Sequence, residues 1–188
     1  MSENPIQQSI RDAAQVIASL ERQTDRIESI CDQVTETLRR GKKILTAGHG
    51  GSAAEALHMS EELMGRFDKD RRPLPAVALT ADPTLLTCIG NDYGFEAIFP
   101  RQVEGLCQSG DLLVIFSTSG NGNGFGKALE AARAIGGRVV ALLGKGGGSL
   151  AGRADLELIV DSAVTARIQE AHQLLMHMIL EAVDREFA

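Results

Sequence analysis

Residues 44–66 read ILTAGHGGSAAEALHMSEELMGR. A short apolar run meets the glycine-rich turn GHGGS at residues 48–52, and a long helix-forming segment follows. This order predicts a strand, a tight turn and a helix N-terminus, whose first backbone N–H groups lack partners within the helix and can hold an anion. His58 and Glu62 stand four residues apart in that helix and share one face. An anion cradle beside such a pair predicts chemistry on a phosphorylated metabolite.

From residue 41 onward, apolar strands alternate with helical stretches. The predicted strands are residues 44–47, 76–80, 112–117, 139–143 and 156–160; the predicted helices are 52–66, 125–135 and 163–187, with a broken helical region over 85–106. The alternation predicts an α/β fold with a doubly wound five-stranded parallel sheet. Ligands of such sheets bind beyond the carboxyl ends of the strands, where the glycine-rich loops of this chain fall.

The first 40 residues contain no glycine, and their apolar side chains alternate spacings of four and three, as in a heptad seam with weak positions at Thr24 and Cys31. A continuous helix of this length would be roughly 50 Å long. A domain of this size has a radius of gyration of only ~16 Å. We therefore favour residues 1–40 as a helical oligomerisation segment attached to a domain of residues 41–188. The alternative is a broken helix that packs on its own sheet.

Composition limits the classes of partner and compartment. The 188 residues are 44% apolar, enough for one full core, and the net charge of −6 argues against nucleic-acid and anionic-membrane surfaces. Cys31, Cys88 and Cys107 show no CxxC spacing, so we expect reduced core thiols in a cytosolic protein. The start MSENPIQQSI lacks the features of a signal peptide, and no apolar run approaches the ~18 residues of a membrane span. A cytoplasmic protein is expected.

A second glycine-rich loop, STSGNGNG at residues 117–124, follows the third predicted strand. Its hydroxyl and N–H groups suit a phosphate without a lysine. The phosphate-loop motif GxxxxGK[ST] would require glycine at Asn121 and Ser or Thr at Ala128, and no GxGxxG follows a strand. Either loop alone could be a sharp connection. Two such loops at matching strand ends favour phosphate binding.

The closing helix places Gln169, Gln173 and His177 four residues apart, beside its apolar core stripe. With His58 and Glu62 on the earlier helix, these polar groups indicate the wall of a cleft. Two imidazoles and two side-chain oxygens are ligands that zinc accepts. Spacing alone does not favour a metal, because HxxxE pairs are frequent by chance. Arg66 is best interpreted as a surface residue, with contact to a substrate phosphate as the alternative.

Five ordered segments resemble the sugar isomerase (SIS) domain family, in its phosphoheptose isomerase branch. They are AGHGGSAAEALHMSEELMGRF, IGNDYGFEAIF, FSTSGNGNG, LLGKGGGSLAG and ARIQEAHQLLMHMI, and they lie within residues 47–179. The resemblance implies a flavodoxin-like SIS domain that interconverts sedoheptulose 7-phosphate and D-glycero-D-manno-heptose 7-phosphate, the first step of heptose supply to bacterial surface glycans. It also implies a cytoplasmic homotetramer whose active sites are shared between subunits.

The resemblance also implies the site residues. One Zn²⁺ per subunit would be held at His58, Glu62, Gln169 and His177. The implied substrate-binding positions are His49, Gly50, Gly51, Ser52, Glu62, Asn91, Asp92, Ser117, Thr118, Ser119 and Gln169. Because ketose–aldose isomerisation moves a proton between C1 and C2 through an enediol, it needs a base at carbon and an acid at oxygen. We assign Glu62 as the base and His177 as the acid that also opens the sugar ring.

Three positions depart from the family pattern: His49 replaces asparagine, Gly122 replaces serine and Ala166 replaces aspartate. They bear on the exact substrate more than on the type of reaction. Two other functions remain open at this point. One is a non-catalytic SIS protein that binds a protein partner, a branch that lacks the catalytic glutamate and histidine. The other is an isomerase of a hexulose or pentulose phosphate.

Overall fold

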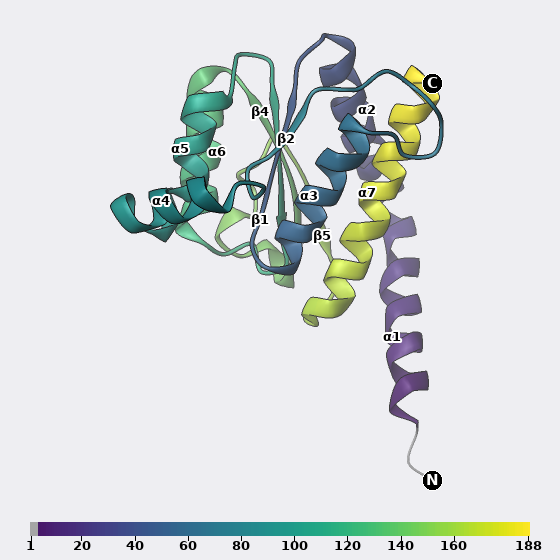
Figure 1. The fold of residues 1–188 in the computed structure, drawn as a ribbon. Coiled ribbons are helices and arrows are strands. Elements are labelled where there is room, and N and C mark those ends of the chain that lie inside the picture. The colour runs from purple at the N-terminus through teal and green to yellow at the C-terminus, as the bar shows by residue number, and fades with distance from the viewer. Residues whose placement is uncertain (1–3) are drawn as a thin grey trace.

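The computed structural model describes residues 4–188, so residues 1–3 of the expected N-terminal segment lie outside the described residues (Figure 1). Its strands are β1 (Ile44–Gly48), β2 (Ala76–Ala78), β3 (Leu112–Ser117), β4 (Arg138–Gly144) and β5 (Leu156–Val160). They form a five-stranded sheet in the order β2-β1-β3-β4-β5, and every pair is parallel. This is the flavodoxin-like order, with a topological switch point between β1 and β3. The predicted doubly wound α/β fold is confirmed.

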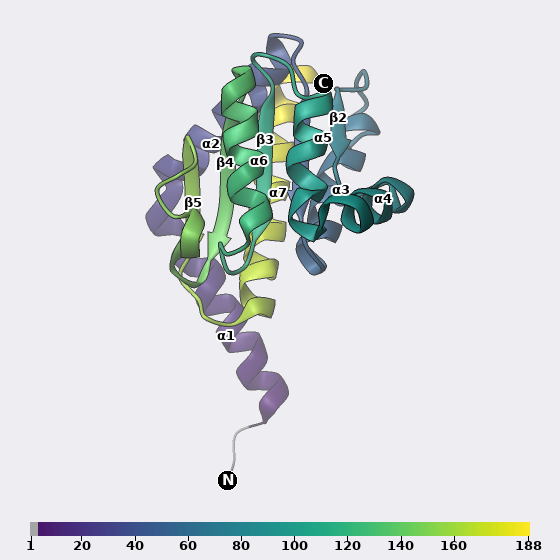
Figure 2. The same ribbon diagram turned by 90° about the vertical axis from the view of Figure 1, so that its left-hand side faces the viewer.

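Helices cover both faces of the sheet (Figure 2). One face carries α2 (Thr24–Arg39), α3 (Gly51–Met64) and α7 (Thr165–Phe187), and the other carries α4 (Pro83–Tyr93), α5 (Ile98–Leu106) and α6 (Asn123–Ile135). Successive side chains of a strand point to opposite faces. Accordingly, Val114 and Phe116 of β3 belong to the core of the first face, and Leu113 and Ile115 to the core of the second.

The N-terminal segment is broken, which corrects the expectation of one continuous helix. Helix α1 (Pro5–Ser19) is followed by the 3₁₀ turn Leu20–Gln23, and α2 begins at Thr24. Helix α2 packs on its own domain, because Ile30, Val34 and Leu38 are buried in the core. Helix α1 has no buried residue and projects from the body of the molecule (Figure 1). The overhang therefore belongs to α1 alone.

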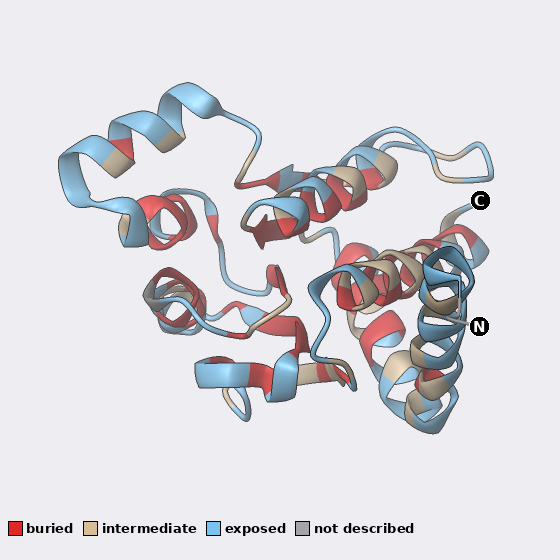
Figure 3. Ribbon diagram, turned by 90° about the horizontal axis from the view of Figure 1, so that it is seen from below, coloured by how far each residue is buried: buried red, intermediate tan, exposed pale blue. Residues whose placement is uncertain are grey.

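The region after β2 is the broken helical region that the sequence predicts. Helix α4 runs through Gly90 and ends at Tyr93, and the break falls at Gly94, whose φ of 87° suits glycine. Asp82 caps the helix by accepting from the N–H groups of Thr84 and Leu85, as Asp–Pro predicts. Most of α4 is exposed at the left of the molecule (Figure 3).

Cys88 is exposed on α4, whereas Cys31 and Cys107 are buried, so the expectation of three core thiols is wrong for Cys88. The cause is the projection of α4 away from the sheet. Burial raises the pKa of the Cys31 thiol to about 11, which keeps that group protonated. None of the helices within residues 4–188 has both the length and the apolarity that a membrane span requires.

Candidate active site

Two helices bring the predicted acid–base residues together. Helices α3 and α7 both start at the carboxyl end of the sheet and run side by side (Figure 1). On α3, His58 Nε2 lies 3.1 Å from Glu62 Oε1. The His58 ring meets the ring of His177 on α7 edge to face, with centroids 5.6 Å apart. Both side chains of the α3 pair are partly shielded, at 36% exposure for His58 and 17% for Glu62.

Gln173 joins the two imidazoles. Its Nε2 lies 2.8 Å from His58 Nδ1 and 2.9 Å from His177 Nε2. An amide nitrogen only donates, so both ring nitrogens act as acceptors in this arrangement. The other ring nitrogen of His58, Nε2, faces the Glu62 carboxylate. The cluster of His58, Glu62, Gln173 and His177 is therefore a connected hydrogen-bond network between α3 and α7.

The two glycine-rich loops form a second part of the site. A cavity of about 210 Å³ lies at the carboxyl ends of β1 and β3. Its lining comprises His49, Gly51, Ser52, Phe116, Ser117, Thr118, Ser119, Asn121, Phe125, Thr165 and Gln169. The cavity thus collects residues from the turn after β1, the loop after β3 and the first turns of α7. We call it the loop cavity.

Hydroxyl groups in the loop cavity are oriented as donors. Ser117 Oγ accepts the N–H of Gly120 at 3.0 Å, and Ser119 Oγ accepts the N–H of Asn121 at 3.2 Å. A hydroxyl that accepts from the backbone keeps its own O–H to donate. The start of α3 adds the positive end of a helix dipole. The cavity therefore presents donors and positive potential to an anion, without a cationic side chain in its lining.

Gln169 belongs to the loop cavity rather than to the network with His177. A Cβ atom at Gly51 would lie only 2.1 Å from Gln169 Nε2, so the two residues touch where α3 and α7 begin. Gln169, Gln173 and His177 follow each other at one-turn intervals, about 6 Å apart along the helix axis. Helix α7 thus connects the loop cavity to the cluster of His58, Glu62, Gln173 and His177, which we call the acid–base cluster.

His49 is the wall of the loop cavity on the side of α5. Its ring centroid lies 5.1 Å from that of Phe95, 4.8 Å from Phe99 and 4.6 Å from Phe125. Burial lowers the pKa of His49 from its ordinary value. The imidazole is therefore neutral near pH 7 and can serve a ligand as a hydrogen-bond donor and acceptor, but not as a cation.

Not all predicted substrate positions meet in this chain. Asn91 and Asp92 lie on exposed α4, where Asn91 Nδ2 donates to Asp92 Oδ1 at 2.8 Å, and they are absent from the described lining of the loop cavity. Gly50 forms the entry to α3 with a φ of 58°, a conformation that favours glycine. Arg66 is exposed just beyond the end of α3.

The structure surrounds the acid–base residues with further neighbours. The one-turn spacing of Gln173 with Gln169 and His177 predicts Gln173 at the wall of a cleft, and the structure places it between the two imidazoles. Glu61 is exposed beside Glu62. Phe67 lies in the loop after α3, with its ring centroid 5.5 Å from that of His177. Nothing in the sequence pattern links Phe67 to a residue 110 positions away.

The donor groups in this region fit a divalent cation. His58, Glu61 and Glu62 each offer a ligand atom, and these atoms lie within 4.8 Å of one another. Imidazole nitrogen and carboxylate oxygen are ligands of zinc. His177 Nε2 and His58 Nδ1 lie 2.9 and 2.8 Å from the same Gln173 amide nitrogen, which places a second imidazole beside this group. These groups are therefore a candidate site for a divalent cation.

Comparison with known proteins shows that this chain is similar to sugar isomerases. The family model of the SIS domain matches residues 8–144. The chain is 52% identical to the phosphoheptose isomerase of Campylobacter concisus over 161 residues, which cover 86% of this chain and 85% of that relative.

Solved structures show the same likeness in three dimensions. A phosphoheptose isomerase from Francisella tularensis superposes with a TM-score of 0.92 at 34% identity, covering 96% of each chain. The phosphoheptose isomerase GmhA from Neisseria gonorrhoeae gives a TM-score of 0.86 at 39% identity, covering 96% of this chain and 95% of that one. The similarity extends over nearly the whole chain, including the N-terminal helices.

Proposed function

This chain belongs to the SIS-domain family, within its phosphoheptose isomerases, and from that premise we propose that it interconverts sedoheptulose 7-phosphate and D-glycero-D-manno-heptose 7-phosphate. It is an isomerase. The observation that carries the proposal is the arrangement of a donor-lined loop cavity and an acid–base cluster along the same helix pair. A phosphosugar needs one group to anchor its phosphate and another to move its protons.

The loop cavity would bind the phosphate. Ser52, Ser117, Thr118 and Ser119 supply hydroxyl groups, and the start of α3 supplies the helix dipole. Holding the phosphate, which does not react, restricts where C1 and C2 of the same molecule can lie. Gln169 and neutral His49 offer hydrogen bonds to sugar hydroxyls from two walls of the cavity. Gly50 and Gly51 allow the backbone to approach the ligand closely.

Glu62 and His177 would transfer the protons. Glu62 removes the proton from C1 of the ketose and returns it at C2, through an enediol. His177 moves a proton between the oxygens on C1 and C2 and assists ring opening. Its Nε2 lies 2.9 Å from Gln173 Nε2, so Gln173 orients the ring. Gln173 and His58 hold the two groups in one network.

Zinc belongs to the proposal as a resident ion. His58, Glu62 and His177 would hold it, whereas Gln169, the fourth ligand that the family resemblance implies, faces Gly51 in the loop cavity. When bound, the ion polarises a carbonyl oxygen and stabilises negative charge that develops on it. A carboxylate that binds zinc is a weaker base, and Glu62 has both roles in this proposal. Assays with and without a chelator measure whether turnover depends on zinc.

A cytoplasmic homotetramer with shared active sites completes the proposal. Helix α1 exposes Ile6 and Ile10 at 69% and 64% of their surface, which a second subunit would cover. Asn91 and Asp92 lie on exposed α4, so we propose that they serve a site formed with a neighbouring subunit. Within the N-terminal segment, α1 would then serve assembly, whereas α2 packs into the core of the domain.

An NMR assay with sedoheptulose 7-phosphate tests the function. The purified protein is incubated with the ketose phosphate, with and without a zinc chelator. Aldoheptose phosphate signals are expected, and they should disappear with the chelator and return with added zinc. Folded protein that forms no product, with zinc supplied, would refute this substrate. A panel of hexulose and pentulose phosphates would then identify another ketose substrate.

A further inference from the structure

A buried ion pair connects the end of α3 to α7. Arg71 Nε lies 2.9 Å from Asp184 Oδ1, and the two side chains are 0% and 4% exposed. Burial alone raises the pKa of the Asp184 carboxyl, but the N–H groups of Lys69 and Asp68 and the Arg71 guanidinium outweigh this effect and lower the pKa. The aspartate is therefore charged at neutral pH, and the pair is held by charge-assisted hydrogen bonds.

The guanidinium of Arg71 also binds the helix turn that carries Glu62. Arg71 Nη2 donates to the carbonyl oxygen of Glu62 at 2.7 Å, and Arg71 Nη1 donates to that of Leu63 at 2.9 Å. Carbonyls in the last turn of a helix have no partner within the helix, and a positive charge there complements the dipole. Arg71 thus fixes the backbone of Glu62 relative to α7.

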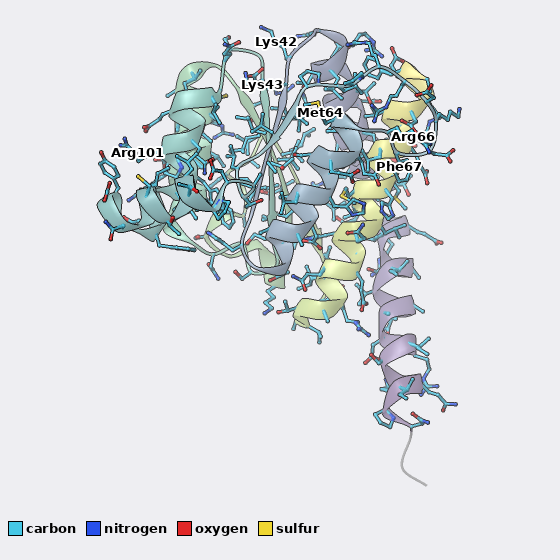
Figure 4. All side chains as sticks on the ribbon, in the orientation of Figure 1. Lys42, Lys43, Met64, Arg66, Phe67 and Arg101 are labelled. Carbon is cyan, nitrogen blue, oxygen red and sulfur yellow. The ribbon has the colours of Figure 1, made fainter. Side chains whose placement is uncertain are left out.

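Asp184 also binds the backbone of the loop after α3, on the side of the acid–base cluster where His177 lies. Its Oδ2 accepts the N–H of Asp68 at 2.9 Å and of Lys69 at 3.0 Å. Phe67 precedes these residues and tilts against the ring of His177. Arg66 and Phe67 lie beside α7 just past the end of α3 (Figure 4). Asp184 thereby holds the loop that supports one face of His177.

We propose that Arg71 and Asp184 are a positioning pair for proton transfer, fixing Glu62 through its backbone carbonyl and His177 through Phe67. The inference rests on the proposed function, because it concerns the two residues that move the protons. Neither member of the pair lines the loop cavity. Its loss should therefore disturb the proton-transfer geometry and leave phosphate binding intact.

The first test is Arg71→Lys in the full chain with zinc present. A lysine keeps the charge, but its compact ammonium cannot reproduce the planar fork that reaches Asp184 and two carbonyls together. We expect kcat to fall by about 10–100-fold, because small displacements of reacting groups are that damaging. KM should stay within about threefold, because binding in the loop cavity is unchanged. A parental kcat, or a KM that rises in parallel with the loss of kcat, would overturn the proposal.

Glu186→Gln is the matched control. Glu186 lies two positions beyond Asp184 on α7 and pairs with Arg39 at 2.8 Å, but its side chain is 39% exposed. Loss of this surface pair should leave kcat within about twofold of the parental value. An equal loss of kcat in both variants would mean that any cross-link to α7 matters, which contradicts a specific role for Arg71.

A double variant separates positioning from stability. Arg71→Met with Asp184→Asn leaves no buried charge unpaired, and the asparagine oxygen can still accept the loop N–H groups. We expect a thermal midpoint closer to the parental value than that of Arg71→Met alone, with kcat still about 10-fold or more below parental. Recovery of kcat together with the thermal midpoint would assign the pair to stability only.

NMR of the imidazole nitrogens gives a readout that does not depend on turnover. The chain has four histidines. In Arg71→Lys, the signals of His58 and His177 should shift, whereas those of His49 in its aromatic cage should not. Unchanged His177 signals would overturn the positioning role. A parental enzyme that fails to convert sedoheptulose 7-phosphate would instead refute the proposed function, and this spectrum would still test the pair.

Discussion

At the scale of single residues, the network between α3 and α7 explains how Glu62 and His177 could divide the proton transfers. Gln173 donates to both imidazoles, and His58 Nε2 faces the Glu62 carboxylate. These four side chains are therefore joined in one network before the substrate arrives. Such preorganisation matters because proton transfer requires groups already within hydrogen-bond reach.

Glu62→Gln and His177→Gln should each lower kcat by at least ~100-fold, because either change removes a group that exchanges a proton. The NMR assay measures the loss, and light scattering should show an unchanged oligomer. Glu181→Gln is the control, since Glu181 is exposed one turn beyond His177 on α7. Turnover near the parental value in either site variant would remove that residue from the mechanism.

His49 should make stability depend on pH. Because burial lowers its pKa in the folded chain, the unfolded chain binds a proton near pH 6.5 that the folded chain resists. Stability therefore falls as the pH drops below about 6.5 and is fully present above it.

Urea unfolding at about pH 7.5 and about pH 5.5, on either side of the ordinary pKa, compares the parental chain with His49→Asn. The parental chain should lose more free energy of unfolding between the two values, because asparagine does not titrate. An equal loss in both proteins would contradict the assignment of a depressed pKa to His49.

At the scale of elements, glycines in the two loops have different tasks. A Cβ atom at Gly51 would meet only the flexible end of the Gln169 side chain. A Cβ atom at Gly120 would lie 1.8 Å from the backbone oxygen of Gly147, in a residue with a φ of 61°. The close approach at Gly51 therefore involves a side chain that lines the loop cavity. The close approach at Gly120 involves the backbones of two loops that pack together.

Gly51→Ala should therefore keep the fold and displace Gln169 from the loop cavity. We expect an increase of about fivefold in KM, equivalent to roughly 1 kcal/mol or one hydrogen bond. Gly120→Ala should instead lower the free energy of unfolding by about 1–3 kcal/mol, from strain and backbone overlap. Denaturant titration and steady-state kinetics of both variants distinguish the two effects, and identical behaviour would contradict this division.

At the scale of the whole molecule, the two N-terminal helices pack differently, because α2 belongs to the core and α1 projects from it. Deletion of residues 1–40 would remove Ile30, Val34 and Leu38 from the core of the chain itself. Helix α1 buries none of its residues in this chain, so substitutions there address assembly without damage to the core. Seen from below, the ribbon of α1 has the colours of exposed and intermediate residues (Figure 3).

Ile6→Ser with Ile10→Ser should dissociate the proposed tetramer, because each isoleucine would lose about 1.5–3 kcal/mol of burial per subunit. Size-exclusion chromatography with light scattering measures the mass, and circular dichroism should be unchanged. The control is Gln7→Ser with Gln15→Ser, two exposed positions of α1 outside the seam. A tetramer that persists in the isoleucine variant would refute the role of α1 in assembly.

The sequence by itself determined that the sheet is parallel and doubly wound and that glycine-rich loops follow its strands. It also determined that His58 and Glu62 lie one helical turn apart. These features are local, since hydrophobic periodicity and glycine-rich turns act within a few residues. Phe116 and Leu113 alternate between two cores for the same reason. The sequence left the break before Thr24 as an alternative only, because a heptad pattern continues through a 3₁₀ turn without a change of spacing.

Only the tertiary structure decided which distant residues meet. Arg71 reads as part of a loop, yet it is fully buried against Asp184, 113 positions later. Phe67 reaches His177, and Gln169 turns toward Gly51 rather than toward His58. Such contacts depend on how α3 and α7 pack on one sheet face, and no periodicity along the chain encodes that packing. The type of chemistry is thus local information, whereas the alignment of its groups is set by the fold.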